Sequence, residues 1–256
     1  MTLPVILHIP HASRALPAKD LVGFLRPTDN MEIELDRLTD HFTDEIFRAD
    51  QPEITRVIFP VSRYLVDPER FPVDEEEPMA SHGMGVLYTD DTQLRPYRRP
   101  VNSWERKRLL DRYYYPHHAA LDQATELALK KAEAVLFIDC HSFPDQALPC
   151  DLDQSPIRPD ICLGTDPYHT PDKLLETVKA VFEQSGYCVT VNSPYAGTLI
   201  PNIAYRKGRR VVGLMIELNR RLYLKTGTIA EKDQERLSAL TKVINDVIAA
   251  AREIKM

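Results

Sequence analysis

Six short runs of apolar and β-branched residues are spread along the chain. They lie at residues 4–10, 54–59, 134–139, 160–165, 188–192 and 211–218. Continuous apolar runs of this length, without alternation, are typical of strands buried on both faces of a parallel or mixed sheet. The pattern therefore predicts a mostly parallel, mixed sheet with helices on both sides.

Amphipathic patterns of helical period separate these runs. They cover residues 31–48, 102–131, 171–186 and 230–254. The first is expected to be one continuous helix, because Leu38, Phe42 and Ile46 recur on a single face. Asn102 and Glu105 form a possible capping box at the start of the second. Strands that alternate with helices predict an α/β protein of three layers.

No repeat, low-complexity tract or change of composition divides the sequence, so we expect one domain over residues 1–256. Residues 60–101 form a long connection of weak periodicity, which in a compact domain is usually functional or disordered. The sequence contains only nine glycines and no glycine-rich phosphate-binding motif. This argues against a Rossmann dehydrogenase and a P-loop enzyme.

The composition narrows the possible partners and location. The formal net charge is -6 and basic residues form no long run, so no nucleic-acid partner is expected. The first residues lack a basic leader and no apolar run could span a bilayer, so we expect a cytoplasmic protein without membrane contact. The cysteines show no CxxC spacing, which favours reduced thiols at Cys140, Cys150, Cys162 and Cys188.

Two predicted strands end in side chains that can bind metals. The first, in the stretch ILHIPHAS, carries His8 and His11, and the third runs through Asp139 into His141. Strand geometry places Asp139 and His141 on one side and Cys140 on the other, which weighs against a Cys140 nucleophile. Ligands collect at the carboxyl ends of strands in α/β sheets. We favour His11 as a metal ligand, with His8 in the wall of the site.

Glu217 lies near the end of the last predicted strand, in a run apolar enough to be buried. A buried carboxylate must be paired or bind something, because an isolated charge is costly there. Two histidines, an acidic ligand and a carboxylate base together are typical of a catalytic zinc site. The acidic ligand is expected after the first strand, where spacing alone does not choose between Glu32, Asp36, Asp40 and Asp44.

Six motifs occur in a fixed order from about residue 5 to 223. They are IPHAS, ELDRLTD, VSRYLVDPERFP, IDCHSFP, NSPYAGT and IELNRRLY. Together they resemble the N-formylglutamate amidohydrolase family. The resemblance implies a fold similar to zinc carboxypeptidases, aspartoacylases and murein amidases, with one zinc ion at the strand ends. It implies His11 and His141 as zinc ligands with Asp36 as the acidic ligand, Glu32 as the alternative to Asp36, and Glu217 as general base.

The same resemblance implies residues that bind the substrate. Arg70 would hold a substrate carboxylate in a bidentate pair, and Arg63 a second carboxylate or the oxyanion. Asn192 and Tyr195 belong to the loop of the NSPYAGT motif, and Arg220 lies beside Glu217 in the sequence. We expect these five side chains to bind a small acidic N-acyl amino acid.

The expected activity is therefore zinc-dependent hydrolysis of the amide of a small N-acyl amino acid, similar to N-formylglutamate. The sequence does not indicate an oligomeric state. Glu69 stands where the family pattern has asparagine, and Thr198 where a second glycine is usual. These departures leave an alternative, in which a catalytically altered member of the fold acts as a small-molecule binding or regulatory protein.

Overall fold

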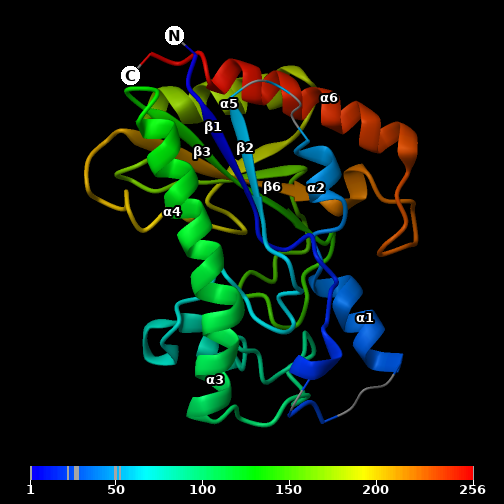
Figure 1. The fold of residues 1–256 in the computed structure, drawn as a ribbon. Coiled ribbons are helices and arrows are strands. Elements are labelled where there is room, and N and C mark those ends of the chain that lie inside the picture. Colours follow the sequence, from blue (N-terminus) through cyan, green and yellow to red (C-terminus); the bar gives the residue numbers. More distant parts are fainter. Residues whose placement is uncertain (1, 22, 26–28, 49–50, 52, 256) are drawn as a thin grey trace.

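The computed structural model describes residues 2–255 except for 22, 26–28, 49–50 and 52 (Figure 1). Its centre is a six-stranded sheet of order β2-β1-β3-β6-β4-β5. The strands are β1 (Val5–Ile9), β2 (Ile54–Ile58), β3 (Val135–Phe143), β4 (Ile161–Gly164), β5 (Val189–Val191) and β6 (Val211–Asn219). Neighbouring strands are parallel, except that β4 runs antiparallel to β6. All six predicted strands and the mixed sheet are confirmed.

Burial differs between the centre and the edges of this sheet. Every residue of β1, β3, β4 and β6 is buried. The edge strands β2 and β5 are only partly covered, and Ile58 of β2 is 41% exposed. The prediction of burial on both faces is wrong for these two strands, because an edge strand has a neighbour on one side only.

The helices form layers on the two faces of the sheet. Helices α5 (Asp172–Gln184) and α6 (Gln234–Ala251) cover one face, where their apolar side chains pack with alternate strand residues such as Leu7. Helix α4 (Tyr115–Leu129) covers the other face, and its Leu121 packs with Ile6. The three-layer α/β fold is therefore confirmed. None of the helices in the described part of the chain has the length and hydropathy that a membrane span needs.

The remaining elements lie mostly beyond the carboxyl ends of β1, β3 and β6, as Figure 1 shows for α1 and α3. Asn102 caps α3 (Ser103–Leu109) by accepting a hydrogen bond from the Glu105 amide, as predicted. A π-helical segment (Leu110–Tyr114) connects α3 to α4. Short 3-10 turns occupy Ala18–Asp20, Asp74–Glu76, Pro78–His82 and Arg220–Leu222.

The helix predicted over residues 31–48 is interrupted. Helix α1 (Asp29–Leu38) ends before α2 (Thr43–Ile46), and Phe42 between them has a φ of 62°, which a continuing α-helix does not allow. The amide of Asp40 instead donates to the carbonyl of His11, at 3.0 Å. This break removes Asp40 from the helical stripe and holds it against the loop that follows β1.

Candidate active site

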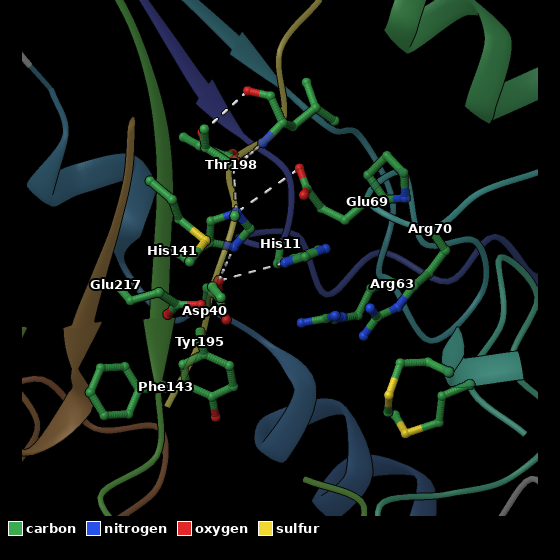
Figure 2. Close-up of a pocket in the computed structure, with 18 of the residues that line it drawn as sticks. His11, Asp40, Arg63, Glu69, Arg70, His141, Phe143, Tyr195, Thr198 and Glu217 are labelled. Atoms are coloured by element: carbon green, nitrogen blue, oxygen red, sulfur yellow. Dashed lines mark hydrogen bonds and ion pairs between the residues drawn. The ribbon is translucent and has the colours of Figure 1, made fainter. Parts of the chain in front are cut away.

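A cavity of about 910 Å³ opens at the carboxyl ends of β1, β3 and β6 (Figure 2). These strands are parallel, so the residues at their ends meet at one edge of the sheet. The register pairs His141 of β3 directly with Glu217 of β6. His11, in the loop after β1, lines the same cavity. The structure thus brings together the two histidines and the glutamate named from the sequence.

The two histidines present the same ring nitrogen to the cavity. His11 Nε2 lies 2.9 Å from Asp67 Oδ1, and His141 Nε2 lies 3.0 Å from Asp139 Oδ1. In a neutral ring, a carboxylate acceptor at Nε2 favours the proton there and leaves a lone pair on Nδ1. Both Nδ1 atoms face Asp40 Oδ2, at 3.6 Å from His11 and 3.3 Å from His141.

These three atoms fit a divalent metal. A tetrahedral zinc site with bonds of about 2.0–2.1 Å places its donor atoms about 3.3 Å apart. The donors of His11, Asp40 and His141 lie within 4.8 Å of one another, and all three residues are buried. Within the described part of the chain, His11 Nδ1 has no hydrogen-bond partner. A buried ring nitrogen without a hydrogen-bond partner is available to bind a metal ion.

Several carboxylates and guanidinium groups surround the cavity. The carboxylates that converge here belong to Asp40, Asp67, Glu69, Asp139 and Glu217, and the guanidinium groups to Arg63, Arg70 and Arg220. Burial raises the pKa of Glu69, and the neighbouring Asp139 carboxylate raises it further. A cation bound among these carboxylates would favour their ionised forms.

Asp40, and not the favoured Asp36, lies beside the two histidines. The structure does not bring Asp36 or Glu32 to the two histidines, because both lie within α1 and form ion pairs with Arg14. Asp40 reaches the histidines because α1 ends before it. Arg220 then holds the Asp40 carboxylate, with Nη2 2.9 Å from Oδ1.

Arg220 therefore supports the candidate metal site instead of offering its guanidinium to a substrate. Its three nitrogens donate to Asp40, to Ser142 and to the carbonyl of Arg37. The side chain is 8% exposed. A ligating carboxylate is commonly oriented by such a hydrogen bond, which also tunes the affinity for the metal. The expectation that Arg220 binds substrate does not match this geometry.

Glu217 is buried beside His141 with a free carboxylate oxygen. Among the described residues, its Oε2 has no hydrogen-bond partner. Burial raises the pKa of Glu217 to about 7, and the neighbouring His141 opposes part of this rise. A carboxylate with such a pKa can accept a proton and release it again near neutral pH.

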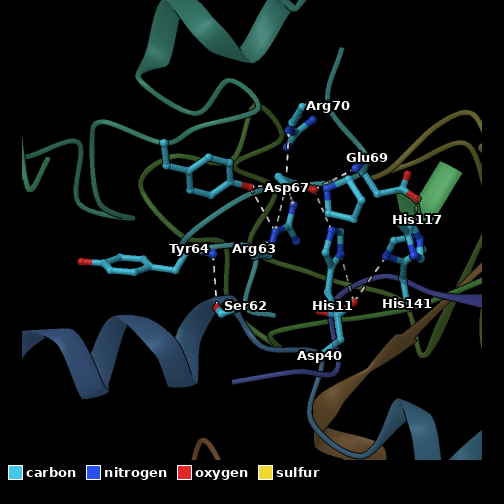
Figure 3. A network of polar contacts seen from close by, with 12 residues as sticks. His11, Asp40, Ser62, Arg63, Tyr64, Asp67, Glu69, Arg70, His117 and His141 are labelled. Atoms are coloured by element: carbon cyan, nitrogen blue, oxygen red, sulfur yellow. Dashed lines mark hydrogen bonds and ion pairs between the residues drawn. The ribbon is translucent and has the colours of Figure 1, made fainter. Parts of the chain in front are cut away.

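Asp67 connects the histidine side of the cavity to two arginines (Figure 3). Its Oδ1 pairs with His11, and its Oδ2 accepts from Arg63 Nη2 at 2.8 Å and from the Tyr88 hydroxyl. Arg70 Nε lies 3.6 Å from the same Oδ2. Burial favours the neutral acid, but Arg63 and His11 hold the pKa of Asp67 well below its usual range. Asp67 is therefore an anion that positions three functional side chains.

Arg63 and Arg70 give the cavity a cationic side (Figure 2). In the described structure Arg70 Nε has no hydrogen-bond partner. Glu69 lies with Oε1 3.2 Å from His8 Nδ1. Arg70 forms its ion pairs with Asp67 and with Glu77, whose Oε1 lies 3.8 Å from Nη1. The two arginines named from the sequence are therefore placed where they can meet a carboxylate of a ligand.

Tyr195 lines the cavity as expected, and its ring lies 5.5 Å from that of Phe143 between centroids. Its hydroxyl accepts a hydrogen bond of 2.7 Å from Arg158. Asn192 is not among the described side chains that line the cavity. Its amide instead bonds the backbone and hydroxyl of Thr165, so it anchors the start of the loop that carries Tyr195.

Sequence reasoning missed the support around the histidines. His8 Nδ1 lies 2.9 Å from Asp139 Oδ1, and His8 Nε2 lies 2.8 Å from His117 Nε2. His117 on α4 is 5% exposed. Its spacing from Leu121 and Thr125 on the buried face of α4 was a signal that could have identified it.

A mixed α/β sheet that brings two histidines, an aspartate and a buried glutamate together at its strand ends has the groups that a hydrolase needs. The chain belongs to the N-formylglutamate amidohydrolase family, whose model matches residues 3–224.

Two solved structures are similar over nearly their full length. The crystal structure of N-formylglutamate amidohydrolase from Ralstonia eutropha JMP134 has a TM-score of 0.81 and 26% identity, covering 98% of this chain and 95% of that one. A gene product from Agrobacterium tumefaciens has a TM-score of 0.66 and 19% identity, covering 97% and 90%. No curated protein matches the sequence significantly.

Proposed function

We propose that this protein is a zinc-dependent amidohydrolase that cleaves the amide of a small acidic N-acyl amino acid of the N-formylglutamate type. The convergence of His11 Nδ1, His141 Nδ1 and Asp40 Oδ2 beside the buried Glu217 carries the proposal. Family membership and the name of the similar Ralstonia eutropha enzyme support the reaction and the substrate.

His11, Asp40 and His141 would hold one zinc ion. When bound, the ion would polarise the acyl oxygen of the substrate and make a water molecule more acidic. Arg220 keeps the Asp40 carboxylate in place, while Asp67 and Asp139 keep the two histidine rings in the required tautomer.

Glu217 acts as the general base. Its free Oε2 accepts a proton from the water as the water oxygen bonds to the acyl carbon. The same carboxyl group then returns the proton to the nitrogen as the carbon–nitrogen bond breaks. The products are formate, or the corresponding acid, and a free amino acid. A pKa of about 7 suits both transfers, because neither the gain nor the loss of the proton is strongly uphill.

Arg63 and Arg70 bind the carboxylates of the amino-acid part. Both line the cavity, and Asp67 limits their movement. Two guanidinium groups match a dicarboxylate such as glutamate in charge and geometry. This anchoring aligns the amide with the attacking water and lowers the entropic cost of the reaction.

The alternative of a binding protein without catalysis is less well supported. It depended on the departures at Glu69 and Thr198, and neither side chain replaces a metal donor or the base. Glu69 faces His8 and leaves the arginines available.

Formate release from N-formyl-L-glutamate tests the proposal. Protein stripped of metal should be inactive, and one equivalent of zinc per chain should restore turnover. Unchanged activity in the stripped protein, or no formate release from protein that holds one zinc ion per chain, would contradict the proposed function.

A further inference from the structure

The cavity is larger than N-formylglutamate requires. That molecule has only about a dozen non-hydrogen atoms, whereas cavities of roughly 300–1,000 Å³ enclose ligands of drug size. The volume of about 910 Å³ therefore leaves space beyond the reacting amide. The side chains around this space indicate what it can hold.

The two arginines and an aromatic pair lie on opposite sides of the candidate metal ligands. In Figure 2, Arg63 and Arg70 lie on one side of His11, whereas Phe143 and Tyr195 lie on the other, next to Glu217. Phe143 follows His141 by two positions in β3, so both side chains project from the same face of the strand. An aromatic pair thus stands beside the proposed base, opposite the cationic side.

The apolar surface continues into the segment that follows β3. Leu152 of this segment lines the cavity and is 71% exposed. Arg158 fixes the segment to the aromatic pair, because it donates to Asp151 Oδ2 at 3.0 Å and to the Tyr195 hydroxyl at 2.7 Å. We call Phe143, Tyr195 and Leu152 the apolar wall.

We propose that the apolar wall binds the acyl group of the substrate, and that the preferred substrates are N-acyl amino acids with an apolar acyl chain longer than formyl. The inference rests on the proposed function, because Arg63 and Arg70 set the orientation of the substrate amide in the cavity. With the carboxylates at these arginines and the amide at the metal ligands, the acyl group points toward the apolar wall. A formyl group has no carbon atom beyond the acyl carbon to cover that surface.

Binding to the zinc-loaded Glu217→Gln variant tests the inference without turnover. The ligands are N-formyl-, N-butanoyl- and N-hexanoyl-L-glutamate, with affinities measured by calorimetry. Burial of one methylene group strengthens binding about fourfold, so hexanoyl should bind at least about tenfold more tightly than formyl even with partial burial. An affinity that stays the same or falls from formyl to hexanoyl would overturn the inference.

A matched pair of variants locates the effect. Leu152→Ser in the Glu217→Gln background should lower the ratio of hexanoyl to formyl affinity by about threefold or more. Leu127→Ser serves as control, since Leu127 on α4 is 50% exposed and is not a described lining residue. Equal ratios in the two variants would contradict a role for the apolar wall.

Hydrolysis by the wild-type protein distinguishes a failure of the proposed function from a failure of the inference about the acyl group. Tighter binding of hexanoylglutamate without release of any acid would support the apolar wall and contradict the proposed function. Formate release from N-formylglutamate together with weaker binding of hexanoylglutamate would support the function and overturn the inference about the acyl group.

Discussion

Asp40 Oδ2 lies 3.3 Å from His141 Nδ1, although the two residues belong to distant parts of the chain. The contact depends on the end of α1 at Leu38, on the hydrogen bond from the Asp40 amide to His11, and on Arg220 at the other carboxylate oxygen. The amide of Ser142 also donates to Asp40 Oδ2, at 3.1 Å.

We predict that Asp40→Asn loses bound zinc, whereas Asp36→Asn retains it. The amide keeps the shape of the side chain but removes the negative charge that attracts the cation. Asp36 pairs with Arg14, so its replacement changes only a partly exposed ion pair. Metal content per chain, measured by mass spectrometry after purification without chelator, checks this. Equal zinc content in the two variants would refute the role of Asp40.

Glu217→Gln should reduce kcat for N-formylglutamate by about 100-fold or more, because glutamine cannot accept the proton. The variant should still bind one zinc ion, since Glu217 is not among the three donor residues. Glu176→Gln on the exposed side of α5 is the control and should match the wild type. A folded, metal-loaded Glu217→Gln protein with wild-type turnover would exclude the general-base role.

The pH profile should show an acidic limb. Burial raises the pKa of Glu217 to about 7, and only the deprotonated carboxylate can act as base. The value of kcat/KM should therefore fall as the pH is lowered below about 7, and reach a plateau above it. Rates between pH 5 and 8.5 in one buffer system test this; a constant kcat/KM down to pH 5 would be inconsistent with it.

Arg70→Ala should impair substrates that carry free carboxylates by about 10- to 100-fold in kcat/KM, as expected for the loss of a charge-assisted hydrogen bond. Esters of the same substrates should be affected much less. Arg209→Ala, at an exposed position, provides the control. If wild-type protein hydrolyses esterified and free-acid substrates equally well, the carboxylate role of Arg70 is wrong.

Asp67→Asn should weaken both metal binding and the preference for free carboxylates, since one side chain contacts His11 and both arginines. Loss of a carboxylate that orients a metal-binding histidine typically costs 10- to 100-fold in affinity. Tyr88→Phe removes one contact to Oδ2 and leaves the His11 contact intact, so zinc affinity should change little. Competition with a chelator compares the variants; similar zinc affinities in both would argue against the link through Asp67.

The sheet could be predicted from the sequence because each strand is a short apolar run with a clear boundary. His141 and Glu217 could be identified from the sequence because they lie at the ends of predicted strands. The position of a residue in a strand fixes where its side chain lies. Asp40 could not be identified in this way. The regular acidic spacing suggested an uninterrupted helix, whereas the left-handed conformation of Phe42 depends on tertiary contacts that a local pattern does not contain.

The partners of the residues that support the candidate site could not be predicted from the sequence either. Asp67 lies in the connection 60–101, where weak periodicity gave no direction for its side chain, although the motif around it was recognisable. Asn192 and Arg220 were expected to face a ligand because they belong to the motifs NSPYAGT and IELNRRLY. In the structure their hydrogen bonds hold Asp40 and Thr165 instead, and nearness in sequence does not reveal such partners.

An anomalous difference map at the zinc absorption edge, from crystals of the zinc-loaded protein, tests the central claim most directly. We predict one strong peak per chain, within bonding distance of His11 Nδ1, His141 Nδ1 and Asp40, beside Glu217. A single peak elsewhere, or bonding through the Nε2 atoms that face Asp67 and Asp139, would contradict the account of this site.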